Sequence, residues 1–225
     1  MKIQVVKNIL DANDRIADEN RSLFDEKKIF VMNLMSSPGA GKTSLVERTI
    51  EALRDHCRIG VIEGDIQSTC DADRVAALGI PVVQINTGGG CHLDANMVRE
   101  GLAGLDLDAL DLLIVENVGN LVCPAEFKIG EDAKVMILST PEGADKPSKY
   151  PLIFQNSAVM ILNKIDLLPH LDFDRDKARR DALALNRDLT IFEVSCRTGA
   201  GLDAWFGWLK SRVEFRGHEF RGQYT

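Results

Sequence analysis

A short segment with two glycines carries the clearest chemistry in this chain of 225 residues. It matches the pattern G-x-x-x-x-G-K-[ST] from Ser36 to Thr43, except that Ser36 stands where the first glycine is usual. Glycines let the backbone curl until several N–H groups point at one phosphate, and a helix that begins there adds its positive dipole end. We therefore predict a phosphate-binding loop formed by Gly39, Ala40, Gly41, Lys42, Thr43 and Ser44.

Two side chains of this loop have expected roles in catalysis. The ammonium of Lys42 can reach the β- and γ-phosphates of a nucleotide, and the hydroxyl of Thr43 can hold Mg²⁺. The alternative is a glycine turn that matches the pattern by chance. An apolar run from Ile29 to Met35 precedes the loop and a helix-like pattern follows it. This strand–loop–helix context favours the phosphate site.

A second motif, Asn163-Lys164-Ile165-Asp166, ends another apolar run and bears on the base. The carboxylate of Asp166 can accept hydrogen bonds from the N1–H and the exocyclic amine of guanine, a donor pair that adenine lacks. Asn163 is expected to tie the base loop to the phosphate loop, and the stem of Lys164 can lie over the base. The alternative is an ordinary surface turn.

The loop Ser195-Cys196-Arg197, which follows the last apolar run, supports the guanine interpretation. It resembles the S-A-K loop that touches the guanine oxygen in GTPases, with Cys196 and Arg197 as departures. If the contact is a backbone N–H, these two side chains matter little. Because the two motifs occur together with the phosphate loop, we predict that the chain binds GTP and GDP rather than ATP.

Two acidic residues that follow apolar runs are candidates for magnesium binding and catalysis. Glu116 begins an E-x-x-G segment where many GTPases have D-x-x-G, and the N–H of Gly119 could meet the γ-phosphate. Asp65 also follows a strand-like run and could hold Mg²⁺ or position water. The alternative is that either carboxylate caps a helix. No arginine finger is evident, so we expect slow intrinsic hydrolysis.

Cys91, His92 and Cys123 form a possible site for a softer metal ion. Two thiolates and an imidazole suit Zn²⁺ or Ni²⁺, and all three residues come after predicted strands, on the nucleotide side. Three ligands do not complete the coordination shell, so water or a second copy of the chain must supply another. The alternative is that these are ordinary free cysteines with no metal role.

The elements that must position these residues alternate between strand and helix. We expect helices over 11–28, 42–53, 71–78, 94–102 and 202–213, and strands over 29–35, 58–63, 82–85, 112–115, 135–138, 159–162 and 191–194. Apolar strands alternating with helices predict an α/β fold, with a mostly parallel sheet flanked by helices on both faces. We expect a helical extension over 1–28 packed on a GTPase domain over 29–225.

Composition and charge exclude several classes of protein. Hydrophobic residues make up 45% and charged residues 27%, the balance of an ordinary globular protein. A net charge of −7 without a basic cluster speaks against nucleic-acid binding. No apolar run approaches the roughly 18 residues of a membrane span, and no signal peptide is visible. Five cysteines, an odd number, fit free thiols, so we expect a cytoplasmic protein without membrane contact.

Taken together, these motifs resemble the HypB family, the hydrogenase nickel-incorporation GTPases. The resemblance implies a P-loop NTPase fold of the SIMIBI class and a GTP-dependent homodimer that helps to insert nickel into [NiFe]-hydrogenase. It also implies Cys91, His92 and Cys123 as interfacial metal ligands, and a HypA-type nickel chaperone and the hydrogenase large subunit as partners. The residues that carry it are 37–43, 88–93, 116–124, 145–151 and 163–166.

The chain departs from some members of that family, and other functions remain open. Residues 1–10 contain no cysteine or histidine, so we do not expect nickel storage or tight nickel binding at the N-terminus. One alternative is a maturation GTPase for urease or another metal centre, although the urease type resembles Cys-Pro-His and here Cys91 and His92 are adjacent. Another is a metal-binding module in which the nucleotide is only regulatory.

Overall fold

A computed structural model describes residues 5–66 and 70–218 and contains a single parallel sheet. Its seven strands lie in the order β3-β2-β4-β1-β5-β6-β7, and every neighbouring pair is parallel. The carboxyl ends of all strands therefore lie at one edge of the sheet, where ligands of such folds bind. The strands are β1 Phe30–Ser36, β2 Ile59–Asp65, β3 Val82–Asn86, β4 Leu112–Glu116, β5 Ala133–Ser139, β6 Val159–Asn163 and β7 Thr190–Glu193.

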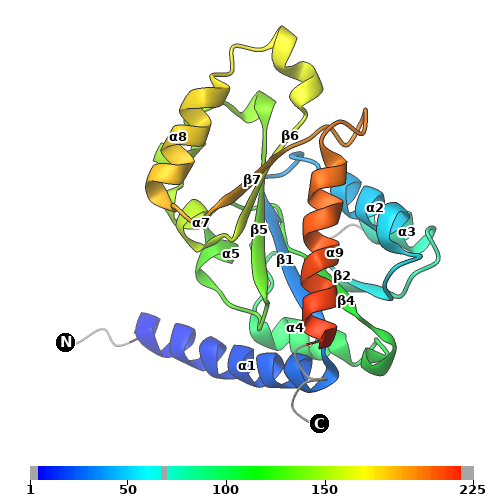
Figure 1. Cartoon of the computed structure of the whole chain (residues 1–225). Helices are drawn as coiled ribbons and strands as arrows, with labels where there is room; N and C mark the ends of the chain where they lie inside the picture. Colours follow the sequence, from blue (N-terminus) through cyan, green and yellow to red (C-terminus); the bar gives the residue numbers. More distant parts are fainter. Residues whose placement is uncertain (1–4, 67–69, 219–225) are drawn as a thin grey trace.

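Helices cover both faces of this sheet. One buried apolar cluster joins the sheet to α2, α3 and α9, and two others join its opposite face to α1 and α4 and to α5, α7 and α8. Figure 1 shows α8 on the side of the molecule away from α2 and α3. The α-helices are α1 Val5–Lys27, α2 Lys42–Leu53, α3 Cys70–Ala76, α4 Ala95–Leu102, α5 Cys123–Glu126, α6 Lys146–Lys149, α7 Pro151–Asn156, α8 Arg175–Leu185 and α9 Leu202–His218.

The central strand β1 explains why the core has two sides. All seven of its residues are buried, as expected for a strand covered on both faces. Because successive side chains of a strand point to opposite faces, Met32 and Leu34 join the cluster with α2 and α9. Val31 packs with α1 and α4 on the other face. This buried strand holds the phosphate loop that follows it in a fixed position.

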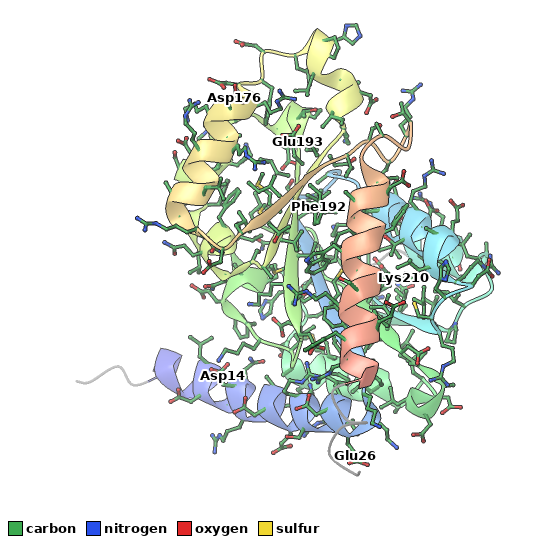
Figure 2. The ribbon with its side chains drawn as sticks, viewed as in Figure 1. Asp14, Glu26, Asp176, Phe192, Glu193 and Lys210 are labelled. Atoms are coloured by element: carbon green, nitrogen blue, oxygen red, sulfur yellow. The ribbon has the colours of Figure 1, made fainter. Side chains whose placement is uncertain are left out.

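Aromatic side chains hold α9 against the sheet. Phe192 of β7 lies beside α9, as Figure 2 shows, with its ring centroid 6.0 Å from that of Trp205 and 6.3 Å from that of Trp208. The two indole rings stack with centroids 5.5 Å apart. The Trp205 Nε1–H donates to Thr49 Oγ1 of α2 at 3.0 Å. The helix that begins at the phosphate loop is therefore braced by α9.

The N-terminal helix α1 packs on α4 through buried asparagines. Asn13 Oδ1 accepts from the Ala95 N–H at 2.9 Å, and Asn20 Nδ2 donates to the Ala95 carbonyl at 2.8 Å. Phe24 is fully buried in the cluster with α4. The helix runs from Val5, earlier than the expected start at residue 11, whereas residues 1–4 lie outside the described part of the chain.

The structure contains all seven expected strands and the five expected helices, with small shifts at their ends. The short helices α5, α6 and α7 and the longer helix α8 were not predicted. Helix α8 buries only the small side chains Ala178 and Ala182, so it lacks a strong apolar pattern, although Asp174 caps it by accepting from the Lys177 N–H at 2.8 Å. Within the described residues, no helix is both long and apolar enough to cross a membrane.

Candidate functional site

The predicted phosphate loop connects β1 to α2 at the carboxyl edge of the sheet. Gly41 has φ of 105°, a conformation that favours glycine, and a Cβ there would lie 2.5 Å from Asn163 Nδ2. Ser36, which replaces the usual glycine, is buried at the end of β1, and its Oγ donates to the Ser37 carbonyl at 2.7 Å. Lys42 Nζ lies 3.4 Å from Ser36 Oγ. The serine is therefore accommodated without opening the loop.

The predicted base-binding motif lies against this loop, and Asn163 ties the two together as expected. Asn163 Nδ2 donates to the Ala40 carbonyl at 2.9 Å, and its Oδ1 accepts from the Cys196 N–H at 3.3 Å. Lys164, with φ of 64°, donates from Nζ to the Gly39 carbonyl at 2.7 Å. One asparagine thus joins the phosphate loop, the base motif and the Ser195–Arg197 loop.

A pocket of about 510 Å³ lies between the predicted base-binding motif and α2. Asp166 lines it, and its Oδ1 accepts from Ser195 Oγ at 2.6 Å. This hydrogen bond fixes the carboxylate that is expected to read guanine. The other residues that line the pocket are Gly41, Ser44, Glu47, Arg48, Asn163, Lys164, Leu167, Cys196 and Arg197.

Glu142 connects the phosphate loop to the base motif and was not predicted. One of its carboxylate oxygens accepts from Ser37 Oγ, and the other accepts from the N–H and the hydroxyl of Ser139 at 2.6 and 2.7 Å. Thr140, in the same turn, donates from Oγ1 to the Lys164 carbonyl at 2.8 Å. The turn after β5 therefore holds both halves of the nucleotide site.

Three carboxylates meet beside Lys42, of which only Glu116 was predicted. Glu63 of β2 and Glu116 of β4 are partners in the parallel register, and Asp71 of α3 approaches both. One carboxylate oxygen from each of the three lies within 4.8 Å of the others. Thr43 Oγ1 donates to Glu116 Oε1 at 3.0 Å. The predicted magnesium residues Thr43 and Glu116 are therefore together.

The properties of this carboxylate group fit a divalent cation. Glu63 and Glu116 are 3% and 2% exposed, and the Oε2 atom of each has no hydrogen-bond partner among the described residues. Burial, followed by the proximity of Glu116, raises the pKa of Glu63, and burial raises the pKa of Glu116. Buried oxygens without partners are costly unless a proton or a cation compensates them. Hard oxygen ligands of this kind are those that Mg²⁺ prefers.

Asp65 lies at the rim of this group and is not one of the three carboxylates. It lines a cavity of about 250 Å³ together with Lys42, Glu116 and Gly119. Its carboxylate accepts from the N–H of Ile66, the next residue. The expected magnesium set of Thr43, Asp65 and Glu116 is thus only partly assembled, because the adjacent strands β2 and β4 bring Glu63, not Asp65, opposite Glu116.

We predict that Glu63→Gln makes the nucleotide-free protein less sensitive to pH. A buried carboxyl with a raised pKa keeps its proton when folded and loses it on unfolding, so the stability that it confers is full below about pH 4.5 and is lost as the pH rises. Urea unfolding without Mg²⁺ gives the free energy of unfolding at about pH 5 and about pH 8. Its fall between these two pH values should be smaller for the variant than for the parent protein, by on the order of 2 kcal/mol. Glu51→Gln, at an exposed position, is the control, and equal declines would contradict the assignment.

The three predicted soft-metal ligands lie together in one chain. Cys91 and His92 come from the loop after β3, and Cys123 begins α5 after β4. One ligand atom from each lies within 4.8 Å of the others, and Cys91 Sγ is 3.5 Å from His92 Nδ1. Cys91 is exposed, whereas Cys123 and His92 are half-buried. The triad, as we call these three residues, therefore opens to the surface.

The surroundings of the triad suit a metal ion of borderline softness. The His92 ring lies against Phe127 with centroids 4.0 Å apart and ring planes tilted by 33°. Burial lowers the pKa of His92, which favours the neutral imidazole that binds metals. A hydrogen bond with Cys91 raises the pKa of the Cys123 thiol. The short helix α5 is held by Lys134 Nζ and Asn156 Nδ2, which donate to the Ala125 carbonyl at 2.8 and 3.0 Å. Two thiols and an imidazole fit Ni²⁺ or Zn²⁺.

The chain is similar to known proteins over most of its length. Residues 30–193 match the family model described as CobW/HypB/UreG, nucleotide-binding domain. The hydrogenase maturation factor HypB from Azotobacter vinelandii is 53% identical over 208 residues, which cover 92% of this chain and 69% of that protein.

Two solved structures are similar over nearly the whole chain. HypB from Helicobacter pylori, in complex with nickel, has a TM-score of 0.86 at 35% identity and covers 90% of this chain and 95% of its own. HypB from Archaeoglobus fulgidus has a TM-score of 0.85 at 38% identity, with coverages of 91% and 100%. The expected P-loop NTPase fold of the SIMIBI class is confirmed. The chain belongs to the CobW/HypB/UreG family, in the group of hydrogenase maturation factors HypB.

Proposed function

We propose that the chain is a GTP-hydrolysing metallochaperone that assists nickel insertion into [NiFe]-hydrogenase and couples its nucleotide state to metal binding. The observation that carries the proposal is the loop of eight residues from Glu116 to Cys123. This loop begins at the magnesium carboxylates, passes the γ-phosphate side of the site at Gly119 and ends at the triad. Any movement of this loop therefore affects both the nucleotide site and the triad.

The nucleotide site supports GTP hydrolysis through positioning and charge. Lys42 neutralises the phosphates, and Thr43 with the three carboxylates would hold Mg²⁺, which supplies charge stabilisation at the transferred phosphoryl group. Asp166, fixed by Ser195, would accept from guanine. Among the residues that the structure describes, no arginine lines the cavity beside Gly119. Because arginine fingers accelerate GTP hydrolysis strongly, this fits a slow intrinsic rate.

The metal ion is the cargo of the proposed function. Cys91, His92 and Cys123 leave its coordination incomplete, so a further ligand can come from water, a second copy of the chain or a receiving protein. Val122, beside Cys123, is 51% exposed. An exposed triad with an apolar neighbour favours a homodimer that forms at this face, and the resemblance to the HypB group adds a HypA-type chaperone and the hydrogenase large subunit as partners.

We predict that Cys91→Ser and Cys123→Ser each lower the affinity for Ni²⁺ at least about tenfold, because each removes a direct ligand. Nucleotide affinity should stay close to that of the parent protein, since neither thiol lines the base pocket. The measurement is a Ni²⁺ and Zn²⁺ titration of the nucleotide-free, GDP-bound and GTP-analogue-bound protein, with the oligomeric state followed in parallel. Cys57→Ser is the control, because Cys57 packs against the opposite cluster with α2 and α9.

Three outcomes of this titration would remove parts of the proposal. Unchanged affinity in both cysteine variants would remove the metal site. Metal affinity and dimerisation that ignore the nucleotide would remove the coupling and leave a maturation GTPase or a metal-binding module with a separate nucleotide site. A preference for urease maturation over hydrogenase maturation in a cell lacking the native factor would redirect the cargo to another metal centre.

A further inference from the structure

We propose that Asn117 and Leu93 form the joint through which the nucleotide site acts on the triad, with Asn117 as the positioning residue. This inference rests on the proposed function, because it assigns the contact that carries the coupling. The joint lies beneath both sites, and neither residue is expected to touch nucleotide or metal. It connects two loops that the chain order keeps apart, the loop after β3 and the loop after β4.

Asn117 directly follows Glu116 and is completely buried. Its Oδ1 accepts from the Leu93 N–H at 2.9 Å and from the Val118 N–H at 3.0 Å. Its Nδ2 donates to Asn33 Oδ1 in β1 at 3.1 Å. A fully buried side chain that satisfies three polar groups sets the positions of all three, because losing any of these bonds leaves a buried group unpaired.

Leu93 directly follows His92 and is also completely buried. Its side chain packs over Gly64, where a Cβ would lie 2.6 Å from Leu93 Cγ and Cδ1. Gly64 lies between Glu63 and Asp65. Leu93 therefore contacts both acidic strand ends, through its N–H to the residue after Glu116 and through its side chain to the residue after Glu63. The loop that bears Cys91 and His92 rests on the magnesium site.

The loop after β4 also touches the phosphate loop. A Cβ on Gly119 would lie only 3.0–3.1 Å from atoms of Pro38, so the two segments are in close contact. When a γ-phosphate and Mg²⁺ displace this loop, Asn117 moves with it. Leu93 either follows Asn117 and carries Cys91 and His92, or loses its hydrogen bond. In both cases the distances from Cys123 to the other two ligands change.

Asn33 gives this joint a second hydrogen-bonding arrangement. Its Nδ2 is buried and has no hydrogen-bond partner in the part of the chain that the structure describes, although its Oδ1 accepts from Asn117. Rotation of both amides would let Asn33 Nδ2 donate to Asn117 Oδ1, and it would release both N–H groups that Asn117 Oδ1 accepts from, those of Leu93 and Val118. A bistable element of this kind is what energetic coupling between two sites requires.

The test uses the full chain with Asn117→Ala and compares Ni²⁺ affinity in the GDP–Mg²⁺ state with that in the GTP-analogue–Mg²⁺ state. In the parent protein, the Ni²⁺ affinities of these two states should differ by a factor of at least about five, the lower range of allosteric coupling. In the variant, the ratio of the two Ni²⁺ affinities should lie within about twofold of one. Its GDP affinity and its nucleotide-free Ni²⁺ affinity should stay within about threefold of the parent values, since a purely structural defect would lower them instead.

Asn186→Ala is the matched control. Asn186 Nδ2 also donates to backbone carbonyls, those of Phe154 and Ser157, but it lies beside α7 and α8. It should keep the parent ratio. A parent-like ratio in Asn117→Ala overturns the inference. If that variant does not fold, Gly64→Ala pushes Leu93 from its other side, and a parent-like ratio there overturns it equally. A parent protein with no metal binding, or with a ratio of unity, contradicts the proposed function itself.

Discussion

Lys42→Ala should lower the rate of GTP hydrolysis by on the order of 10²-fold or more, the effect expected when one charge that stabilises the transition state is removed. Among the residues that the structure describes, Lys42 Nζ hydrogen-bonds to Ser36 Oγ alone, at 3.4 Å, so its charge is available to the phosphates. Burial raises the pKa of both Glu63 and Glu116, and the charge of Lys42 offsets part of that rise. The measurement is phosphate release under multiple turnover with saturating GTP and Mg²⁺.

Lys210→Ala is the control for that loss of charge. Lys210 lies on α9, away from the carboxyl edge of the sheet (Figure 2), and its Nζ is near the exposed His56 ring. Its replacement should leave turnover unchanged. Turnover of Lys42→Ala above about one tenth of the parent rate would show that the loop binds phosphate without contributing to the chemistry, and this favours the regulatory reading of the nucleotide site.

Asp166→Asn should weaken GTP binding by on the order of 10³-fold and create a preference for xanthosine triphosphate. The carboxylate accepts from two guanine donors, whereas an amide in its place offers only one acceptor and places a donor against the guanine amine. Xanthine carries a carbonyl instead of that amine, so the amide can pair with it. Competition titration of a fluorescent guanine nucleotide against GTP, ATP and xanthosine triphosphate measures the change.

Asp172→Asn serves as the control because Asp172 is exposed, outside the residues that line the base pocket. It should keep the affinity order of the parent. If Asp166→Asn retains GTP affinity and gains no xanthosine binding, the base is not held by this carboxylate. Ser195→Ala should show a weaker effect in the same direction, because its hydroxyl holds Asp166 at 2.6 Å.

The strands were predictable because most of them are nearly continuous apolar runs, the pattern of a strand that is covered on both faces. The base motif was predictable for a different reason. Asn163, Lys164 and Asp166 are close in sequence, and the place of such a motif after a strand fixes its location at the carboxyl edge. Asn163 was expected to tie the base loop to the phosphate loop, and the structure shows that it does so by donating to the Ala40 carbonyl.

The magnesium group was only partly predictable, because it depends on the order of strands. Glu63 and Glu116 are far apart in sequence and become partners because β2 lies beside β4. The signal was present, since both glutamates end apolar runs, but an acidic residue at such a place is often a cap. Asp71 joins them through the position of α3, which the pattern of residues did not determine.

For the triad, the residues could be predicted but their contact in space could not. Its members could be named from the resemblance, but the spacing of Cys91, His92 and Cys123 did not require them to meet, because β2 lies between β3 and β4 in the sheet. The joint below them was not foreseen. Asn117 and Leu93 lie within motifs but carry no charge and no metal ligand, and only their burial and mutual hydrogen bond distinguish them.

The aromatic contact between α9 and the sheet also makes the protein its own optical reporter. Trp205 and Trp208 are the chain's two tryptophans, and their stacked rings should give an exciton signal in far-ultraviolet circular dichroism. Neither indole lines the base pocket. Because Trp205 donates to Thr49 of α2, a change in tryptophan emission on adding nucleotide measures movement of the phosphate-loop helix, free of any direct quenching by the base.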